Sequence, residues 1–210
     1  MLVVGGLLGA FVFAAACWFL LGANAFQESG PIEAMSALGY ALAAALVLIS
    51  LVAGRVTAGG RLNALLCAIL LGALAARELD MHKSELLGSL TRSATYVDPT
   101  RLVSLRLLAA LLVLTFVGAA GILAWRTWRA WRTDRQAPNA VRNAAIGALA
   151  LLAVAKSIDG LGRKLGDIGI TLADRALVLV MCAEETLELA APMIFCACTV
   201  LLVSRRASRA

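Results

Sequence analysis

Apolar segments long enough to cross a lipid bilayer constrain this chain more than any other feature of its sequence. A membrane-spanning helix needs about 20 mostly apolar residues. Six segments approach or exceed that length, and the fifth does so only if its helix continues through Asp159. They cover approximately residues 2–26, 35–52, 62–76, 102–125, 144–155 and 176–203. The sequence therefore predicts an all-α, polytopic integral membrane protein, a bundle of six transmembrane helices that forms one domain over residues 1–210.

The basic residues predict how this bundle is oriented. Arginine is concentrated in the links after the second and fourth segments and in the C-terminal tail, where acidic residues are few. Short basic links of this kind stay in the cytoplasm. Both termini are therefore expected in the cytoplasm, and the other links on the outer side. This topology accounts for the net charge of +6, so the charge gives no reason to expect nucleic acid as a partner.

Three carboxylates interrupt the sixth apolar segment, at Glu184, Glu185 and Glu188. A charged side chain at the centre of a bilayer costs from about 2.5 kcal/mol upward, so such residues usually face the bundle interior and mark a functional site. Their helical spacing turns all three toward broadly one side. Pro192 has no N–H to donate to the carbonyl of Glu188, which leaves that carbonyl for a ligand or water. The length of the segment leaves their depth open, either at mid-bilayer or nearer the outer surface.

The end of the third apolar segment adds a second group of polar residues. Glu78 and His82 lie four residues apart on one helix face, an arrangement that suits a divalent metal ion, and His82 is the only histidine in the chain. With the acids of the sixth segment, the expected metal ligands are Glu78, Asp80, His82, Glu185 and Glu188. The alternative is that His82 only forms hydrogen bonds at the membrane surface and that no metal is bound.

Lysine and arginine near the outer ends of the helices are the expected partners of a substrate. Lys156, Asp159 and Arg163 share one helix face because they are spaced three and four residues apart. Either they neutralise one another, or the cations bind an anionic headgroup while Asp159 joins the acids. The expected substrate-binding residues are Arg77, Arg106, Lys156, Arg163 and Lys164, and the expected catalytic residues are Glu184, Glu185, Glu188 and Asp159. A plainer alternative is that Arg106, Lys156 or Arg163 neutralises the acids and holds the helices together.

Tryptophan and arginine alternate where the fourth apolar segment ends. The residues concerned are Trp125, Arg126, Trp128, Arg129, Trp131 and Arg132. Indole rings favour the headgroup region of a membrane, and guanidinium groups attract anionic lipid. We expect this helix to continue out of the bilayer here and to anchor the protein through contacts with membrane lipids.

Two motifs resemble those of a group of small bacterial inner-membrane proteins. They are Arg-Glu-Leu-Asp-x-His-Lys at residues 77–83 and Glu-Glu-x-x-Glu-Leu, followed by a proline, at residues 184–189. The resemblance covers these motifs and their helices. It implies a multi-pass protein of the bacterial inner membrane and no particular activity.

Three functional classes fit these features. A membrane enzyme that acts on a lipid or lipid-linked substrate, by acid–base or metal-assisted chemistry, needs charged groups at one leaflet, where a headgroup enters from the side. A cation or proton transporter needs polar residues in both halves of the bilayer, and a structural or assembly subunit needs no such site. The inner halves offer little beyond Asn63, Thr115, Asn143 and cysteines, which favours the enzyme. A homo-oligomer is compatible with all three classes.

The predicted topology can be tested with single cysteines in a variant that lacks the five native ones. We expect Ser93→Cys to react with a membrane-impermeant thiol reagent added from the outer side, because its link is predicted to be external. Gln136→Cys should react only after the membrane is opened. The reverse labelling pattern would place the acids near the cytoplasm instead.

Overall fold

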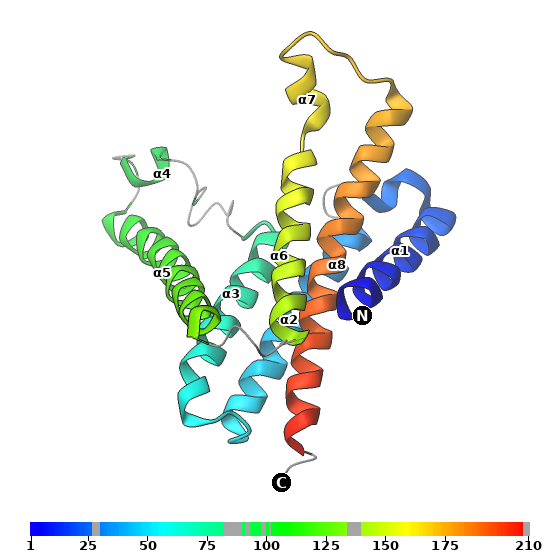
Figure 1. The fold of residues 1–210 in the computed structure, drawn as a ribbon. Helices are drawn as coiled ribbons and strands as arrows, with labels where there is room; N and C mark the ends of the chain where they lie inside the picture. Colours follow the sequence, from blue (N-terminus) through cyan, green and yellow to red (C-terminus); the bar gives the residue numbers. More distant parts are fainter. Residues whose placement is uncertain are drawn as a thin grey trace. The chain divides into compact units, whose positions relative to one another are not determined.

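The computed structural model describes residues 1–26, 30–81, 90, 93–97, 100, 102–133 and 140–207. Helices are the only regular elements in these ranges (Figure 1). Six of them are long and apolar enough to cross a membrane, which confirms the six predicted segments. In chain order they are α1 (Leu2–Leu21), α2 (Pro31–Val52), α3 (Arg61–Glu78), α5 (Val103–Thr133), α6 (Ala140–Ile158) and α8 (Asp174–Ala207). The first span also includes the 3₁₀ helix η1 (Gly22–Phe26), which continues α1.

Several helices extend beyond the apolar segments that predict them. α2 already begins at Pro31, because proline suits a first helical turn, where its missing N–H would have no partner. α5 continues past Trp125 to Thr133, so the tryptophan–arginine series is helical as expected. α6 reaches Ile158 and thereby gains the length that a span requires. The links contain the short helices η2 (Ala58–Gly60), α4 (Ala94–Val97) and α7 (Leu161–Gly166).

The chain divides into two compact units. Unit 1 comprises Met1–Ala43 and Pro138–Ala210, and unit 2 comprises Ala44–Ala137. Unit 1 therefore contains α1, the first half of α2, α6, α7 and α8, whereas unit 2 contains the second half of α2, α3, α4 and α5. The expectation of one domain stays a prediction.

Small side chains line the contacts between the helices of unit 1. α8 packs against α1 and α6, and α1 also contacts α6 (Figure 1). The buried residues of these faces include Gly6, Ala10, Ala14 and Cys17 on α1 and Val141, Ala144, Ala148 and Ala155 on α6. Helices in a membrane gain little from hydrophobic burial, so close packing through small residues holds them together.

Two glycines show how closely these helix backbones approach. A Cβ atom at Gly6 of α1 would collide with the side chain of Ile194 on α8. A Cβ atom at Gly39 of α2 would lie 2.8 Å from Pro192 Cβ on α8. Larger residues at either position would push the helices apart.

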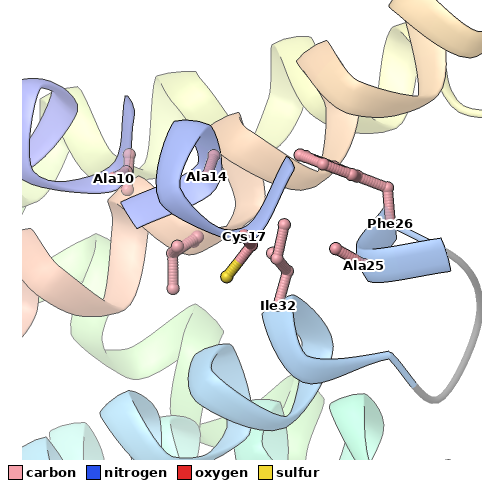
Figure 2. Close-up of a cluster of buried hydrophobic side chains, with 8 residues drawn as sticks. Ala10, Ala14, Cys17, Ala25, Phe26 and Ile32 are labelled. Atoms are coloured by element: carbon pink, nitrogen blue, oxygen red, sulfur yellow. The ribbon is translucent and has the colours of Figure 1, made fainter. Parts of the chain in front are cut away.

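A cluster of buried side chains joins the end of α1, η1, the start of α2 and the middle of α8 (Figure 2). Its members are Ala10, Ala14, Cys17, Ala25, Phe26, Ile32, Leu189 and Ala190. Figure 2 shows Cys17, Ala25 and Ile32 gathered at one place from three different elements. Leu189 and Ala190 directly follow Glu188, so this cluster holds the acidic part of α8 in place.

Gly5 and Gly6 offer a matched pair for testing the packing of α1 on α8. Gly6→Ala puts a methyl group against Ile194, whereas the same group at Gly5 would meet no atom within 4 Å. Overpacking costs about 1–3 kcal/mol, while alanine stabilises a helix over glycine by about 0.5–1 kcal/mol at both positions. We expect Gly6→Ala to unfold at a lower temperature in detergent than Gly5→Ala. Equal unfolding temperatures would argue against close packing at Gly6.

Candidate functional site

Lys156, in the last turn of α6, lies at the centre of a polar cluster in unit 1. Its Nζ atom is 2.6 Å from Glu188 Oε1, 3.1 Å from Asp159 Oδ2 and 3.7 Å from Glu184 Oε1. Asp159 directly follows α6, whereas the two glutamates belong to α8. The lysine therefore joins the two helices through ion pairs. We call these four residues, Lys156, Asp159, Glu184 and Glu188, the Lys156 cluster.

The Lys156 cluster has a buried end and an exposed end. The side chain of Glu188 is only 6% exposed and that of Glu184 15%, whereas Lys156 and Asp159 are 40% and 49% exposed. A buried carboxylate needs a cation close by, because ionised groups lose much of their solvation on burial. Lys156 provides that cation to Glu188 and still presents part of its own surface outward.

One ammonium group serves three carboxylates in this cluster. With all three acids ionised, the cluster carries a surplus of negative charge. Repulsion between the acids falls when a proton or a cationic group enters. Lys156 brings carboxylates from two parts of the chain to one point.

The contacts of Lys156 also locate the acids along α8. Lys156 and Asp159 stand at the very end of α6, so Glu184 and Glu188 lie level with the end of that helix and not with its middle. Along α8 itself the two acids lie in the middle part of the candidate span Asp174–Leu202, so their depth in a membrane stays a prediction. α8 continues beyond this level for several turns toward its start at Asp174.

α7 follows the cluster directly and carries two further cations. Gly160 adopts a left-handed conformation, with φ of 63°, which turns the chain out of α6 and into α7. Lys164 Nζ donates a hydrogen bond to the carbonyl of Ser157 at 3.3 Å. Arg163 and Lys164 are both exposed, and neither forms an ion pair among the described residues. Both cations are therefore open to an anionic ligand beside the Lys156 cluster.

An apolar groove of about 490 Å³ runs between α1 and α8 along the turns that carry the acids. Its lining includes Leu7, Leu8 and Phe11 of α1 and Cys182, Ala183 and Leu187 of α8. Thr186 also lines it, but its hydroxyl donates to the carbonyl of Cys182 at 2.6 Å, so the groove stays apolar. Its dimensions and lining suit a hydrocarbon chain.

Two buried polar residues of α2 were not predicted as part of a site. Ser36 and Tyr40 are both fully buried, one helical turn apart. The ring of Tyr40 lies 6.4 Å from that of Phe195, and Cys196 Sγ donates to the carbonyl of Gly39 at 3.2 Å. The Ser36 hydroxyl has no hydrogen-bond partner among the described residues. The sequence could have indicated that these two residues are buried together, because a spacing of four puts them on one face of an apolar helix. Polar residues in such a helix usually face the interior of a bundle.

Glu185, predicted as a catalytic residue and a metal ligand, is half-buried on the same two turns of α8. It takes no part in the three ion pairs of Lys156 described above. Its role in catalysis and in metal binding therefore stays a prediction.

The predicted site residues of the third and fourth apolar segments belong to unit 2. Arg77 Nη1 lies 3.7 Å from Glu78 Oε1, and Glu78 is buried in the last turn of α3. Asp80 has φ of 52°, a left-handed conformation that aspartate adopts more readily than most residues. Arg106 is half-buried in α5, and its Nε atom has no hydrogen-bond partner in the described ranges.

The predicted metal site draws on residues of both units, one of which the structure does not describe. His82 lies outside the described residues. Glu78 and Asp80 belong to unit 2, and Glu185 and Glu188 belong to unit 1. Within the ranges that the structure describes, no three side chains of His, Cys, Asp or Glu form a group that could hold a metal ion. A metal site that includes His82 therefore stays a prediction.

Comparisons of this chain with protein-family models, with curated proteins and with solved structures found no match. Functional inference therefore rests on the Lys156 cluster and on the features beside it, namely the cations of α7 and the apolar groove of α1 and α8.

Replacing Lys156 by methionine tests whether the cluster stabilises unit 1. The change leaves Glu188 buried without the ammonium group 2.6 Å away. Breaking a buried ion pair costs about 3–5 kcal/mol, and the 40% exposure of Lys156 lowers this cost because solvent screens the pair. We expect a loss of about 1–3 kcal/mol in the free energy of unfolding, measured by denaturation in detergent.

Lys164→Met is the matched control, since Lys164 is exposed and donates to a backbone carbonyl. Its effect should stay within about 0.5 kcal/mol. Adding Glu188→Gln to Lys156→Met should restore part of the lost stability, because no buried charge is then unpaired. A Lys156→Met protein as stable as the parent would show that the pair does not hold α6 to α8.

Proposed function

We propose that this chain is a multi-pass protein of a bacterial inner membrane with both termini in the cytoplasm. We further propose that the Lys156 cluster acts on the headgroup of a lipid or lipid-linked substrate by proton transfer. The observation that carries this proposal is the ammonium group of Lys156 within 4 Å of three carboxylates at the end of α6.

The length of α6 supports a site at the level of lipid headgroups. The candidate span Ala140–Ile158 has 19 residues. At about 1.5 Å per residue it is close to the roughly 30 Å thickness of the hydrocarbon core, so its last turn reaches the membrane surface. A lipid headgroup can enter such a site sideways, without leaving the membrane.

Features beside the cluster could bind both the phosphate and an acyl chain of a phospholipid. The exposed cations Arg163 and Lys164 of α7 would bind the phosphate, and an acyl chain would lie in the groove between α1 and α8. Glu184 is the proposed general acid or base, because it is partly exposed and lies within the cluster. Lys156 would position Glu184, and Glu188 would hold Lys156 in place.

The metal-assisted form of this proposal needs a divalent ion bound by His82 and its acidic neighbours. Such an ion would polarise the substrate or lower the cost of forming hydroxide from water. Metal analysis of the purified parent and of His82→Ala separates this form from plain acid–base chemistry. Loss of one bound ion in the variant would favour the metal-assisted form.

A cation or proton transporter is the second candidate, favoured by the three carboxylates gathered in the cluster. Transport also requires polar residues in the other half of the membrane. Between Glu188 and the end of the candidate span at Leu202, α8 offers Cys196, Cys198 and Thr199, and the Thr199 hydroxyl already donates to the carbonyl of Phe195. These few groups make a continuous polar path the weaker proposal.

The enzyme proposal is tested with the parent and Glu184→Gln in nanodiscs made from bacterial inner-membrane lipids. We expect the parent to change the lipid composition, measured by mass spectrometry of extracted lipids over time. Loss of a general acid or base typically lowers a rate by about 100-fold to 10,000-fold, so Glu184→Gln should be nearly inactive. Glu33→Gln, in the first turn of α2, is a control that should keep the parent's rate.

The same proteins in sealed liposomes distinguish the other functional classes. If the parent leaves the lipids unchanged but carries protons or cations across the membrane, and Glu185→Gln abolishes this flux, the chain is a transporter. If the parent does neither, the cluster is a structural connection between α6 and α8.

A further inference from the structure

An open groove of about 450 Å³ lies in unit 2 between the end of α2 and the start of α3. It is lined by Leu51, Val52, Gly54, Arg61, Leu62 and Leu65. Four of these residues have aliphatic side chains and one has a guanidinium group, so the groove combines an apolar wall with one positive charge. We call it the Arg61 groove.

The side chain of Arg61 is available to a ligand. Arg61 is the first residue of α3, is exposed, and forms no side-chain hydrogen bond or ion pair among the described residues. The candidate span of α2 ends at Val52 and the next one begins at Ala58. The groove therefore lies where two apolar helices end, which in a membrane is the level of the lipid headgroups.

Only basic residues provide formal charge on the two chain segments at this end of unit 2. Residues 53–63 contain two arginines and no acid, and residues 120–133 contain three arginines and no acid. The second stretch is the end of α5. Arg126 Nε donates to Asn63 Oδ1 at 2.6 Å, which places this end of α5 beside the first turn of α3. An anion that approaches the Arg61 groove therefore meets a positive potential.

Tryptophan side chains on α5 support the same level in a membrane. Trp125 and Trp128 are 58% and 49% exposed, and indole rings prefer the headgroup region. The guanidinium of Arg129 lies 5.7 Å from the Trp125 ring centre, and that of Arg132 lies 4.7 Å from the Trp128 ring centre. These arginines are held on α5 by their stacking, whereas Arg61 lines the groove.

We propose that the Arg61 groove binds one anionic phospholipid. The guanidinium of Arg61 binds the lipid phosphate through two parallel hydrogen bonds, a geometry that arginine is well suited to form. An acyl chain lies along the aliphatic wall, which free phosphate would not use. The surrounding arginines favour an anionic lipid over a zwitterionic one. The site is separate from the Lys156 cluster, which belongs to unit 1, and does not depend on the function proposed for that cluster.

Native mass spectrometry of the full-length protein in detergent tests this site. The probes are phosphatidylglycerol, phosphatidylcholine with the same acyl chains, and inorganic phosphate. With Arg163 and Lys164 of α7 replaced by glutamine, so that the lipid site proposed beside the Lys156 cluster does not contribute, we expect the protein to bind one phosphatidylglycerol molecule more tightly than phosphatidylcholine and to bind no phosphate. Arg61→Gln should weaken phosphatidylglycerol binding about fivefold to tenfold, as expected for the loss of one basic contact at a membrane surface.

Two further variants make the result specific to the groove. Leu62→Trp keeps the charge of Arg61 but fills the groove, so it should weaken binding as well. Arg142→Gln removes an arginine from α6 in unit 1 and should leave binding unchanged. Thermal unfolding in detergent verifies that each variant is folded. Equal binding of the two lipids, binding of phosphate alone, or unchanged binding in folded Arg61→Gln would each overturn the proposal.

Discussion

The ion pair between Lys156 and Glu188 is the interaction on which the organisation of unit 1 depends. Glu188 is almost fully buried among apolar helices, where an ionised carboxylate without a partner is strongly unfavourable. Its partner has to come from a neighbouring helix at the same level, so α6 must remain helical as far as Lys156. The left-handed turn at Gly160 then ends α6 just beyond the pair. The buried charge of Glu188 thus requires α6 to extend as far as Lys156, and the chain turns at Gly160 soon after.

Close backbone packing allows an ion pair this short between two helices. Ala155 precedes Lys156, Ala190 lies two residues after Glu188, and both alanines are fully buried. Small side chains beside the charged ones let α6 and α8 approach closely. The long lysine side chain then reaches Glu188 while part of its surface stays exposed. The packing that stabilises unit 1 therefore also produces a cluster with one buried and one exposed end.

The helices were predictable because a membrane span has a minimum length, which six apolar segments of this chain approach or exceed. The sequence offered Arg106, Lys156 and Arg163 as cations that could pair with the acids of α8. It could not select one of them, because spacing along one helix defines a face and not a distance between helices. The structure brings Lys156 to the acids, whereas Arg106 belongs to the other unit. The depth of the acids depends on which turn of α6 meets which turn of α8, a relation that the sequence does not contain. The spacing of Ser36 and Tyr40 marks one face of α2, but which helix covers that face is a relation that the sequence does not contain.

Unit 1 is built from the two ends of the chain, so α1 is synthesised long before its main partner α8. At about 5–20 residues per second, the chain between Gly6 and Ile194 takes roughly 10–40 s to translate. During that time the small-residue face of α1 has no α8 to pack against. Lys156 likewise leaves the ribosome before Glu184 and Glu188, so its ammonium group already exists when the carboxylates emerge. Because the cation is synthesised first, the acids can form their ion pair as soon as α8 packs against α6.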